Sequence, residues 1–430
     1  MRPGAAPRAR RLPAAGLVLL AVLAGGCVQS AEVNRLALID LLALDAAPQG
    51  EILATAQVIM PTRLGVGPAS TAGEGAPFFL VQARGRTVAE ALSNLQKRVP
   101  RQLFLEHLQM LVIGDELARR GLFPVVDFLI REQEIRTDLL VTVTPDTAAD
   151  LLNIASPLPA VPGEAWSDLV RNERLTVSSV RNLFVAMGEE GIEPFLTAIA
   201  PSAVQEPEGG GNLGDMELIG AGLLRGDRLA GYLDRDEALG LQLLLNDRPR
   251  AVVTLDAAEV LARMDNGRAR AEAPFRSPGE PPVHSQDLIS LRLRRADTRL
   301  APVAPDPPTL EISGRLILDV VNTASVLDVE HPEVAAALEE AAADLFASYV
   351  AAAVRKMQAL DSDAAGLGAS FRRSRPEWWR TMRSRWPELF PQAQLIYDLQ
   401  VAVVRTGLAT RPGGPVEPQL WVPRRGGSRR

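Results

Sequence analysis

The feature that most constrains this chain lies at its N-terminus, where a basic segment is followed by a short uncharged run. Residues 1–26 carry four arginines and no acidic residue, and the uncharged run extends from Ala14 to Ala24. This run is shorter than the roughly 20 apolar residues that span a bilayer, and it has the length of the hydrophobic part of a secretory signal peptide. We therefore expect residues 1–26 to act as a signal peptide and the rest to fold outside the membrane.

The signal-like run leads to Cys27, the only cysteine of the chain. A single cysteine excludes an intramolecular disulfide framework, a CxxC redox pair and a multi-cysteine zinc site. Leu23–Cys27 resembles the lipobox of bacterial prolipoproteins, although the leucine usually lies three residues before the cysteine and that position is Ala24 here. We predict that Cys27 receives diacylglycerol and becomes the mature N-terminus. The alternative is a plain secretory signal with a chance cysteine.

The composition of the remaining chain predicts a folded, acidic body. Of 430 residues, 47% are hydrophobic and 23% charged, which is enough for packed cores, and the length predicts two or three domains. Of the formal net charge of −6, the chain beyond residue 26 contributes −10, so nucleic acid is not an expected partner. A second membrane segment is not expected either, because Leu345–Val354 is too short and Leu36–Met60 contains three acidic residues.

Local patterns predict a mixed α/β body (class α+β) of several domains, each a sheet flanked by helices. The Gly- and Pro-rich stretch Pro201–Asp215 is the best candidate for a linker. The predicted division is a signal peptide (1–26), an N-terminal α/β domain (27–205), a middle domain (215–300), a C-terminal domain with a long helix (301–410) and a disordered basic tail (411–430).

Four local expectations are specific enough to check. Thr87 and Glu90 predict a capping box at a helix start, and residues 217–233 predict a hairpin that turns at Arg225–Arg228. The longest helical pattern extends from 332 to 360 and should cover a sheet that includes Gln394–Thr406. Two strands are predicted at Gln286–Leu293 and Thr309–Val321, with Pro302, Pro305, Pro307 and Pro308 between them.

Candidate chemical sites are few, and we expect no cofactor, metal or catalytic centre. His107, His284 and His331 are scattered and favour structural roles, and HExxH, GxSxG and phosphate-loop motifs are absent from the sequence. The tripeptide Arg225–Asp227 spells an adhesion motif, but a tight turn requires the same residues. Trp378, Trp379 and Trp386 are predicted on one helix, where a core or partner contact is favoured over a platform for an aromatic ligand.

A set of segments spread over most of the mature chain carries a further signal: the lipobox, Glu32–Ala37 with the strand to Asp45, His107–Gly121, Asp127–Arg131, Gly220–Leu224, Arg228–Leu233, Gln358–Asp361, Gly366–Gly368, Pro376–Trp379, Trp386–Pro391 and the terminal strand to Gly407. In order and spacing these segments together resemble the Ger(x)C family, the lipoprotein C subunits of spore germinant receptors. Departures from the family pattern are Val28, where an aromatic residue often follows the lipid cysteine, and Leu41 and Ala43, where glycines are usual.

This resemblance implies a mixed α/β fold of three domains and a function without enzymatic activity. It implies a subunit of a nutrient germinant receptor that is lipid-anchored on the outer face of the spore inner membrane. Its implied partners are a membrane A subunit and a permease-like B subunit. Two rival functions stay open: a solute-binding lipoprotein of a transporter, which requires a cleft between similar lobes, and an envelope hydrolase, which requires a nucleophile and a base.

Overall fold

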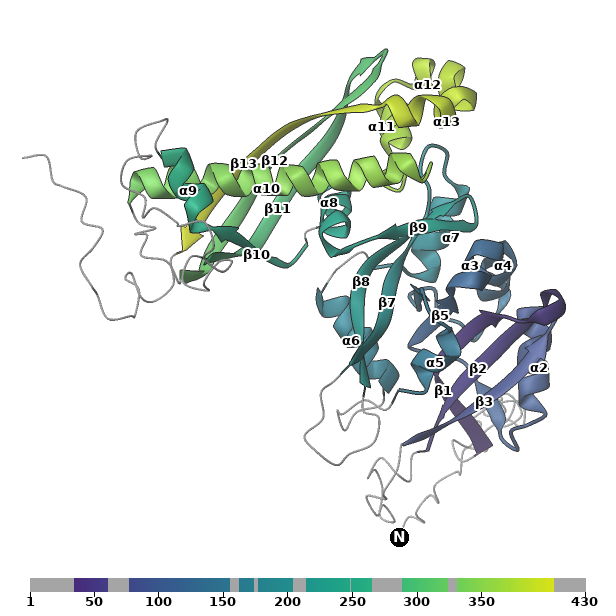
Figure 1. Cartoon of the computed structure of the whole chain (residues 1–430). Helices are drawn as coiled ribbons and strands as arrows, with labels where there is room; N and C mark the ends of the chain where they lie inside the picture. The colour runs from purple at the N-terminus through teal and green to yellow at the C-terminus, as the bar shows by residue number, and fades with distance from the viewer. Residues whose placement is uncertain are drawn as a thin grey trace, which may run out of the picture.

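The computed structural model describes residues 35–60, 77–154, 162–173, 177–203, 214–247, 249–264, 288–323 and 331–405. The signal-like segment, Cys27, His284 and the basic tail lie outside these residues. The described strands form two sheets, which occupy opposite ends of the molecule in Figure 1. None of the described helices is both long enough and apolar enough to span a membrane.

The first sheet has nine strands, eight of them in the order β3-β2-β1-β5-β6-β7-β8-β9, while β4 pairs with β1. Its centre is parallel from β1 through β7, and both sides are extended by antiparallel strands. The strands are β1 (Leu36–Ala46), β2 (Ile52–Ile59), β3 (Phe78–Gly85), β4 (Gln102–Phe104), β5 (Met110–Gly114), β6 (Leu140–Thr144), β7 (Phe195–Ala203), β8 (Gly214–Arg225) and β9 (Arg228–Leu233).

Helices cover both faces of this sheet, so its central strands are apolar on both sides. In β1, Leu41 and Ala43 join one core cluster, whereas Leu42 and Leu44 join the other. The helices of this part of the chain are α2 (Val88–Gln96), α3 (Asp115–Arg120), α4 (Phe123–Arg131), α5 (Ala148–Leu152), α6 (Pro162–Glu173) and α7 (Val180–Gly188), with a short 3₁₀ turn η2 (Pro48–Gly50) after β1.

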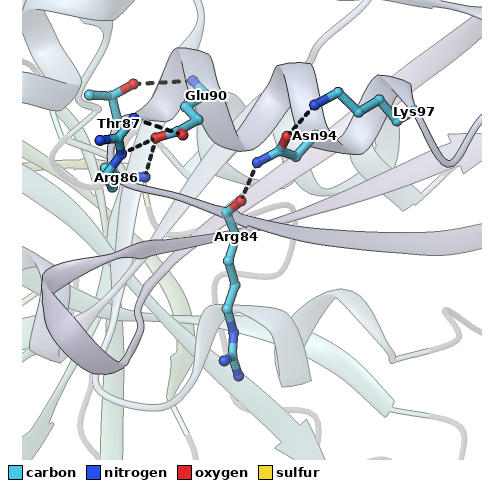
Figure 2. A network of polar contacts seen from close by, with 6 residues as sticks. All are labelled: Arg84, Arg86, Thr87, Glu90, Asn94 and Lys97. Carbon is cyan, nitrogen blue, oxygen red and sulfur yellow. Dashed lines mark hydrogen bonds and ion pairs between the residues drawn. The ribbon is translucent and has the colours of Figure 1, made fainter.

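Helix α2 begins with half of the predicted capping box. The Thr87 side chain accepts a hydrogen bond from the Glu90 backbone N–H at 3.1 Å. The Glu90 carboxylate, however, accepts from the backbone N–H of Arg86 at 2.8 Å and pairs with its guanidinium, as Figure 2 shows. Asn94 then ties the helix to β3 by donating to the Arg84 carbonyl at 2.9 Å. The prediction that the Glu90 side chain accepts from the Thr87 backbone N–H was wrong, because Arg86 offers Glu90 both a backbone donor and a cation.

The second sheet has the order β10-β11-β12-β13 and is covered by the long helix α10, which runs along it in Figure 1. The long helix and the strand from Gln394 are confirmed. The strands are β10 (Ala251–Asp256), β11 (Leu288–Pro305), β12 (Pro308–Thr323) and β13 (Gln394–Arg405). The helices are α8 (Arg235–Leu245), α9 (Ala257–Met264), α10 (Pro332–Ala359), α11 (Leu367–Ser374), α12 (Pro376–Met382) and α13 (Trp386–Leu389), with the 3₁₀ turns η6 (Arg383–Arg385) and η7 (Phe390–Gln392).

Two expectations about organisation differ from the structure. The proline-containing segment between the two predicted strands is the far half of the hairpin β11–β12, which pairs from Ile289–Thr323 to Pro305–Pro308. Prolines are tolerated there because β10 pairs only with Leu288–Leu293, so that among the described strands none lies on this edge of β11 beyond Leu293. The resemblance implies three domains with one sheet each, but the described strands form two sheets. The predicted hairpin β8–β9 continues the first sheet beside β7. The exact domain limits stay a prediction.

Helix α8 connects the two sheets and packs against α10. It starts at a full capping box, in which Asp234 and Glu237 exchange side-chain and backbone hydrogen bonds. Gly240 sits at the crossing, where a Cβ atom would lie 2.2 Å from the backbone oxygen of Tyr349 on α10. One core cluster therefore extends from the first sheet through α8 and α10 to the second sheet.

Gly240→Ala should destabilise the protein, because the added methyl group meets helix backbone that has no room to move. We expect a loss of about 1–3 kcal/mol in the free energy of unfolding, measured by urea denaturation. Gly188→Ala is the matched control, since a Cβ at this helical position meets nothing within 4 Å. It should be neutral or stabilise by up to about 1 kcal/mol. Equal effects of the two substitutions would contradict the close crossing.

Two acidic residues of β1 are buried beneath helix N-termini. The Asp45 carboxylate accepts from the backbone N–H groups of Ala148 and Ala149 at 2.8 and 2.9 Å. Asp40 Oδ2 accepts from Gly163 N–H at 2.6 Å, while its Oδ1 has no hydrogen-bond partner among the described residues. Burial raises the pKa of Asp40 to about 7 against the effect of that hydrogen bond. Asp40 is therefore a titrating group inside the fold.

The raised pKa of Asp40 makes stability depend on pH in a known direction. The unfolded carboxyl ionises near pH 4 and the folded one near pH 7, so ionisation opposes folding and stability falls as pH rises between these values. Asp40→Asn should therefore flatten the decline of the unfolding free energy between pH 4.5 and 7.5, measured by urea titration. Asp138→Asn should keep the wild-type slope there, because the hydrogen bond from Arg136 lowers the Asp138 pKa. An unchanged slope in Asp40→Asn would contradict the assignment.

Candidate functional site

The late family-like segments fold into a compact cluster of short helices at the end of α10. Figure 1 shows α11, α12 and α13 gathered there, beside the start of β13. The three tryptophans lie on α12 and α13, separated by the turn η6, and not on the single helix that was predicted. Trp379 and Trp386 are buried and meet edge to face at 5.6 Å between ring centroids. The preference for a core contact is thus confirmed for these two residues.

A buried carboxylate, Asp363, organises this cluster. Its oxygens accept hydrogen bonds from the backbone N–H groups of Leu367 and Gly368, both at 2.8 Å, and from Trp386 Nε1 at 3.0 Å. The first two donors belong to the N-terminal turn of α11, where the helix dipole favours negative charge. Burial nevertheless raises the pKa of Asp363 to about 7. Asp363 fixes the start of α11 relative to Trp386.

Two glycines allow the backbone to approach the tryptophans. At Gly368 a Cβ atom would lie 2.8 Å from both Trp379 and Trp386. Gly191, which belongs to the segment after α7, has φ +81° and its carbonyl accepts from Ala369 N–H at 2.7 Å. A Cβ at Gly191 would lie 2.6 Å from that nitrogen. Residues 189–194, which lie between α7 and β7, are thus in direct backbone contact with α11.

Acidic side chains of the same segment hold the tryptophan helices from the other side. Glu189 pairs with Arg372 on α11. Glu190 accepts from Trp379 Nε1 at 3.3 Å and pairs with Arg383 at 2.9 Å. The backbone N–H of Glu193 donates to the Asp363 carbonyl at 3.0 Å. Residues 189–193 and the cluster after α10 therefore form one joint between the two parts of the molecule.

The β8–β9 hairpin completes this joint. Ser362 Oγ donates to the Leu224 carbonyl at 2.5 Å, and Arg225 pairs with Asp361 at 3.1 Å. The Asp227 carboxylate accepts from Phe123 N–H at 3.1 Å, so the Arg-Gly-Asp sequence serves as an internal turn. Tyr232 donates to Asp115 at 2.9 Å. Segments near residues 115, 225 and 363, which are far apart in sequence, meet here.

A groove opens at this joint, between α4 and α7 on one side and the tryptophan helices on the other. Its volume is about 1050 Å³. Three large apolar side chains face it although they are exposed to solvent: Phe123, Phe184 and Ile130. Acidic residues and the buried Trp379 complete the lining. We take this groove as the candidate functional site.

The two histidines in the described part of the chain lie apart, in local structural positions. His107 lies in an exposed turn before β5, and His331 caps α10 by accepting from Glu333 N–H at 3.4 Å. His284 lies outside the described residues, as does the predicted lipidation site Cys27. Within the described ranges, no three His, Cys, Asp or Glu side chains gather closely enough to hold a metal ion.

Most groove residues were missed by sequence reasoning. Asp363 lies inside a family-like stretch, between Asp361 and Gly366, but a lone aspartate gives no sign of the three donors that it binds. Phe123 and Phe184 fit amphipathic helices, in which a phenylalanine is ordinarily assigned to the core. Only the tertiary structure shows that both rings are exposed and that α4 and α7, which carry them, lie side by side.

Comparison with known proteins assigns the chain to a family. The model described as "Spore germination protein N-terminal domain" matches residues 29–201, and the model "Spore germination B3/ GerAC like, C-terminal" matches residues 219–407. The chain belongs to the GerAC-like spore germination proteins. The resemblance seen in the sequence is thereby confirmed, and the joint described above is built from segments of both family models.

Individual relatives of this GerAC-like chain are distant but extend over nearly its whole length. It is similar to spore germination protein KC of Bacillus subtilis (strain 168), with 23% identity over 426 residues, 94% of this chain and 98% of the relative. Spore germination protein B3 of the same organism is 20% identical over 398 residues, which cover 89% of this chain and 94% of the relative. The crystal structure of the GerBC protein shares the fold, with a TM-score of 0.50 and 18% identity over 84% of this chain and 96% of that one.

Replacing Trp386 by Phe should weaken the joint, because the buried Asp363 carboxylate loses its indole donor. We expect a loss of about 1–3 kcal/mol in the free energy of unfolding, measured by urea denaturation. Trp378→Phe is the matched control: Trp378 packs on Phe371 at 4.7 Å, and its indole N–H has no hydrogen-bond partner in the described structure. The control should cost clearly less, and a cost equal to that of Trp386→Phe would contradict the role of the hydrogen bond.

Proposed function

We propose that this GerAC-like chain is the lipid-anchored C subunit of a nutrient germinant receptor and acts without enzymatic activity. In this proposal diacylated Cys27 holds the body on the outer face of the spore inner membrane. There it works with the membrane A and B subunits to trigger germination. Family membership supports the receptor role, and the resemblance of Leu23–Cys27 to a lipobox supports the anchor.

The observation that carries the proposal is the convergence of the family-like segments on one structural joint. Segments around Asp115, Gly226 and Asp363 contact one another through backbone hydrogen bonds, buried polar groups and close glycine contacts. Such contacts hold the surfaces of the two parts in a fixed relative position. An arrangement of this kind suits a protein that presents a shaped surface to partners.

The geometry favours this role over that of a solute-binding lipoprotein. That rival requires a cleft between two similar lobes, whereas the two sheets here have nine and four strands and different connectivity. The groove also lies beside the joint and is bordered by outward-facing phenylalanines. A lipid anchor would act by confinement, since it raises the effective concentration of the body near membrane partners.

Replacing Cys27 by Ala tests the anchor and the receptor role together. Without the thiol no diacylglycerol is attached, and the roughly 0.8 kcal/mol per buried methylene that two acyl chains contribute to membrane binding is lost. The variant protein should therefore move from the spore membrane fraction to the soluble fraction, detected by immunoblotting. Nutrient germination, followed by the fall in optical density, should become slower.

Val28→Ala is the matched control, because it changes the neighbouring residue and leaves the thiol in place. It should keep both membrane retention and germination. Membrane retention and germination that are unchanged in Cys27→Ala spores would overturn the anchor. Release from the membrane with normal germination would overturn the need for anchoring in receptor function.

A further inference from the structure

The groove at the joint carries large apolar side chains that the fold itself does not need. Phe123 on α4 is 65% exposed, Phe184 on α7 is 54% exposed and Ile130 on α4 is 44% exposed. The two helices contact each other, so these side chains form one continuous apolar surface along the groove. Clustered exposed apolar surface of this kind marks interaction sites in soluble domains.

The charge of the groove is one-sided. Its lining includes six carboxylates but Arg383 as its only cation among the described residues. Asp127, Glu189 and Glu190 are each paired with an arginine. Glu193 and Asp227, in contrast, accept from the backbone N–H groups of Gly226 and Phe123 and have no ion pair in the described structure. The groove therefore keeps an excess of negative charge beside its apolar surface.

The floor of the groove is rigid, which lowers the cost of binding. Trp379 is held by Glu190, and the adjoining Trp386 is held by Asp363. Burial raises the pKa of Glu193, while the Gly226 N–H and the nearby Arg225 favour its charged form. A preformed site loses little conformational freedom when it is occupied.

We propose that this groove binds an amphipathic helix of a receptor partner that presents large apolar side chains on one face and Lys or Arg beside them. An apolar surface formed by two adjacent helices is the usual receptor for such a helix. The acidic groups around Glu193 and Asp227 select a basic flank and would repel an acidic one. This inference rests on the proposed receptor function, because it supplies the contact through which the subunit meets its partner.

The inference is tested with two synthetic helical peptides of equal length and apolar content, one built from Leu and Lys and the other from Leu and Glu. Their binding to the full chain is measured by fluorescence anisotropy. The Leu/Lys peptide should bind at least tenfold more tightly than the Leu/Glu peptide, and its affinity should fall as salt is raised. Equal affinity for the two peptides would overturn the proposed charge selection.

The contribution of the apolar surface is tested with a matched pair of variants on α7. Phe184 and Val185 are both 54% exposed, but only Phe184 lines the groove. Phe184→Ala should weaken the Leu/Lys peptide at least tenfold, whereas Val185→Ala should leave its affinity unchanged. Phe123→Ala is a second groove variant and should repeat the loss. Equal effects of Phe184→Ala and Val185→Ala would place the peptide elsewhere and overturn the proposal.

Photo-crosslinking in spores identifies the natural occupant. A benzoylphenylalanine in place of Phe184 should crosslink to a segment of another receptor subunit with apolar and basic residues, and one in place of Val185 should not. A crosslink to residues 406–430 of the same chain, to a second copy, or to none of the receptor subunits would overturn the inference. Because all of these variants keep Cys27, their failure would leave the anchor and the germination test of Cys27→Ala untouched.

Discussion

The burial of the Asp363 carboxyl among three N–H donors is the interaction on which the arrangement of the two sheets depends. Its desolvation is partly offset by the N-terminal turn of α11 and by the Trp386 indole, and its pKa is still raised to about 7. The same carboxyl fixes Trp386 against Trp379, and Trp379 in turn meets Glu190 of the first part of the chain. A series of contacts from Asp363 through Trp386 and Trp379 to Glu190 thus connects the tryptophan helices to the segment that follows α7.

Two glycines make this joint possible. Each lies where the chain passes too close to an indole ring or to another backbone segment for a Cβ atom to fit. Gly368 leaves space for both tryptophans, and Gly191 adopts a left-handed conformation that lets its carbonyl reach Ala369. Such close contacts fix the position of one segment relative to the other, because packed atoms resist displacement. The joint therefore fixes which faces of α4 and α7 border the groove.

Much of the fold could be predicted from local sequence patterns, whereas the joint could not. The 28-residue helix α10 and the β8–β9 hairpin follow from periodicity and turn residues, whereas β7, whose end lies in the predicted linker and pairs with β8, was not expected. The strand β11 was missed beyond Leu293 because prolines ordinarily end a strand, and they are tolerated here because β10 stops pairing at Leu293. The division into two sheets was missed because a Gly-rich connection suits a hairpin as well as a linker. The donors to the Asp363 carboxyl come from Leu367, Gly368 and Trp386, but the contact of its carbonyl with Glu193 joins distant parts of the sequence. Phe123 and Phe184 likewise share the groove with Trp379, and no local pattern encodes these contacts.

The position of the groove connects architecture to the proposed role. Its walls come from α4 and α7, which cover the first sheet, and from Trp379 and Arg383, which follow the long helix of the second. A helix bound there would contact both parts at once and would stabilise their present arrangement. The apolar core is already continuous from the first sheet through α8 and α10 to the second, so the two parts resist separation on the side of Gly240. Binding at the groove would add contacts at the joint, where residues 189–193 meet the tryptophan helices through hydrogen bonds and ion pairs.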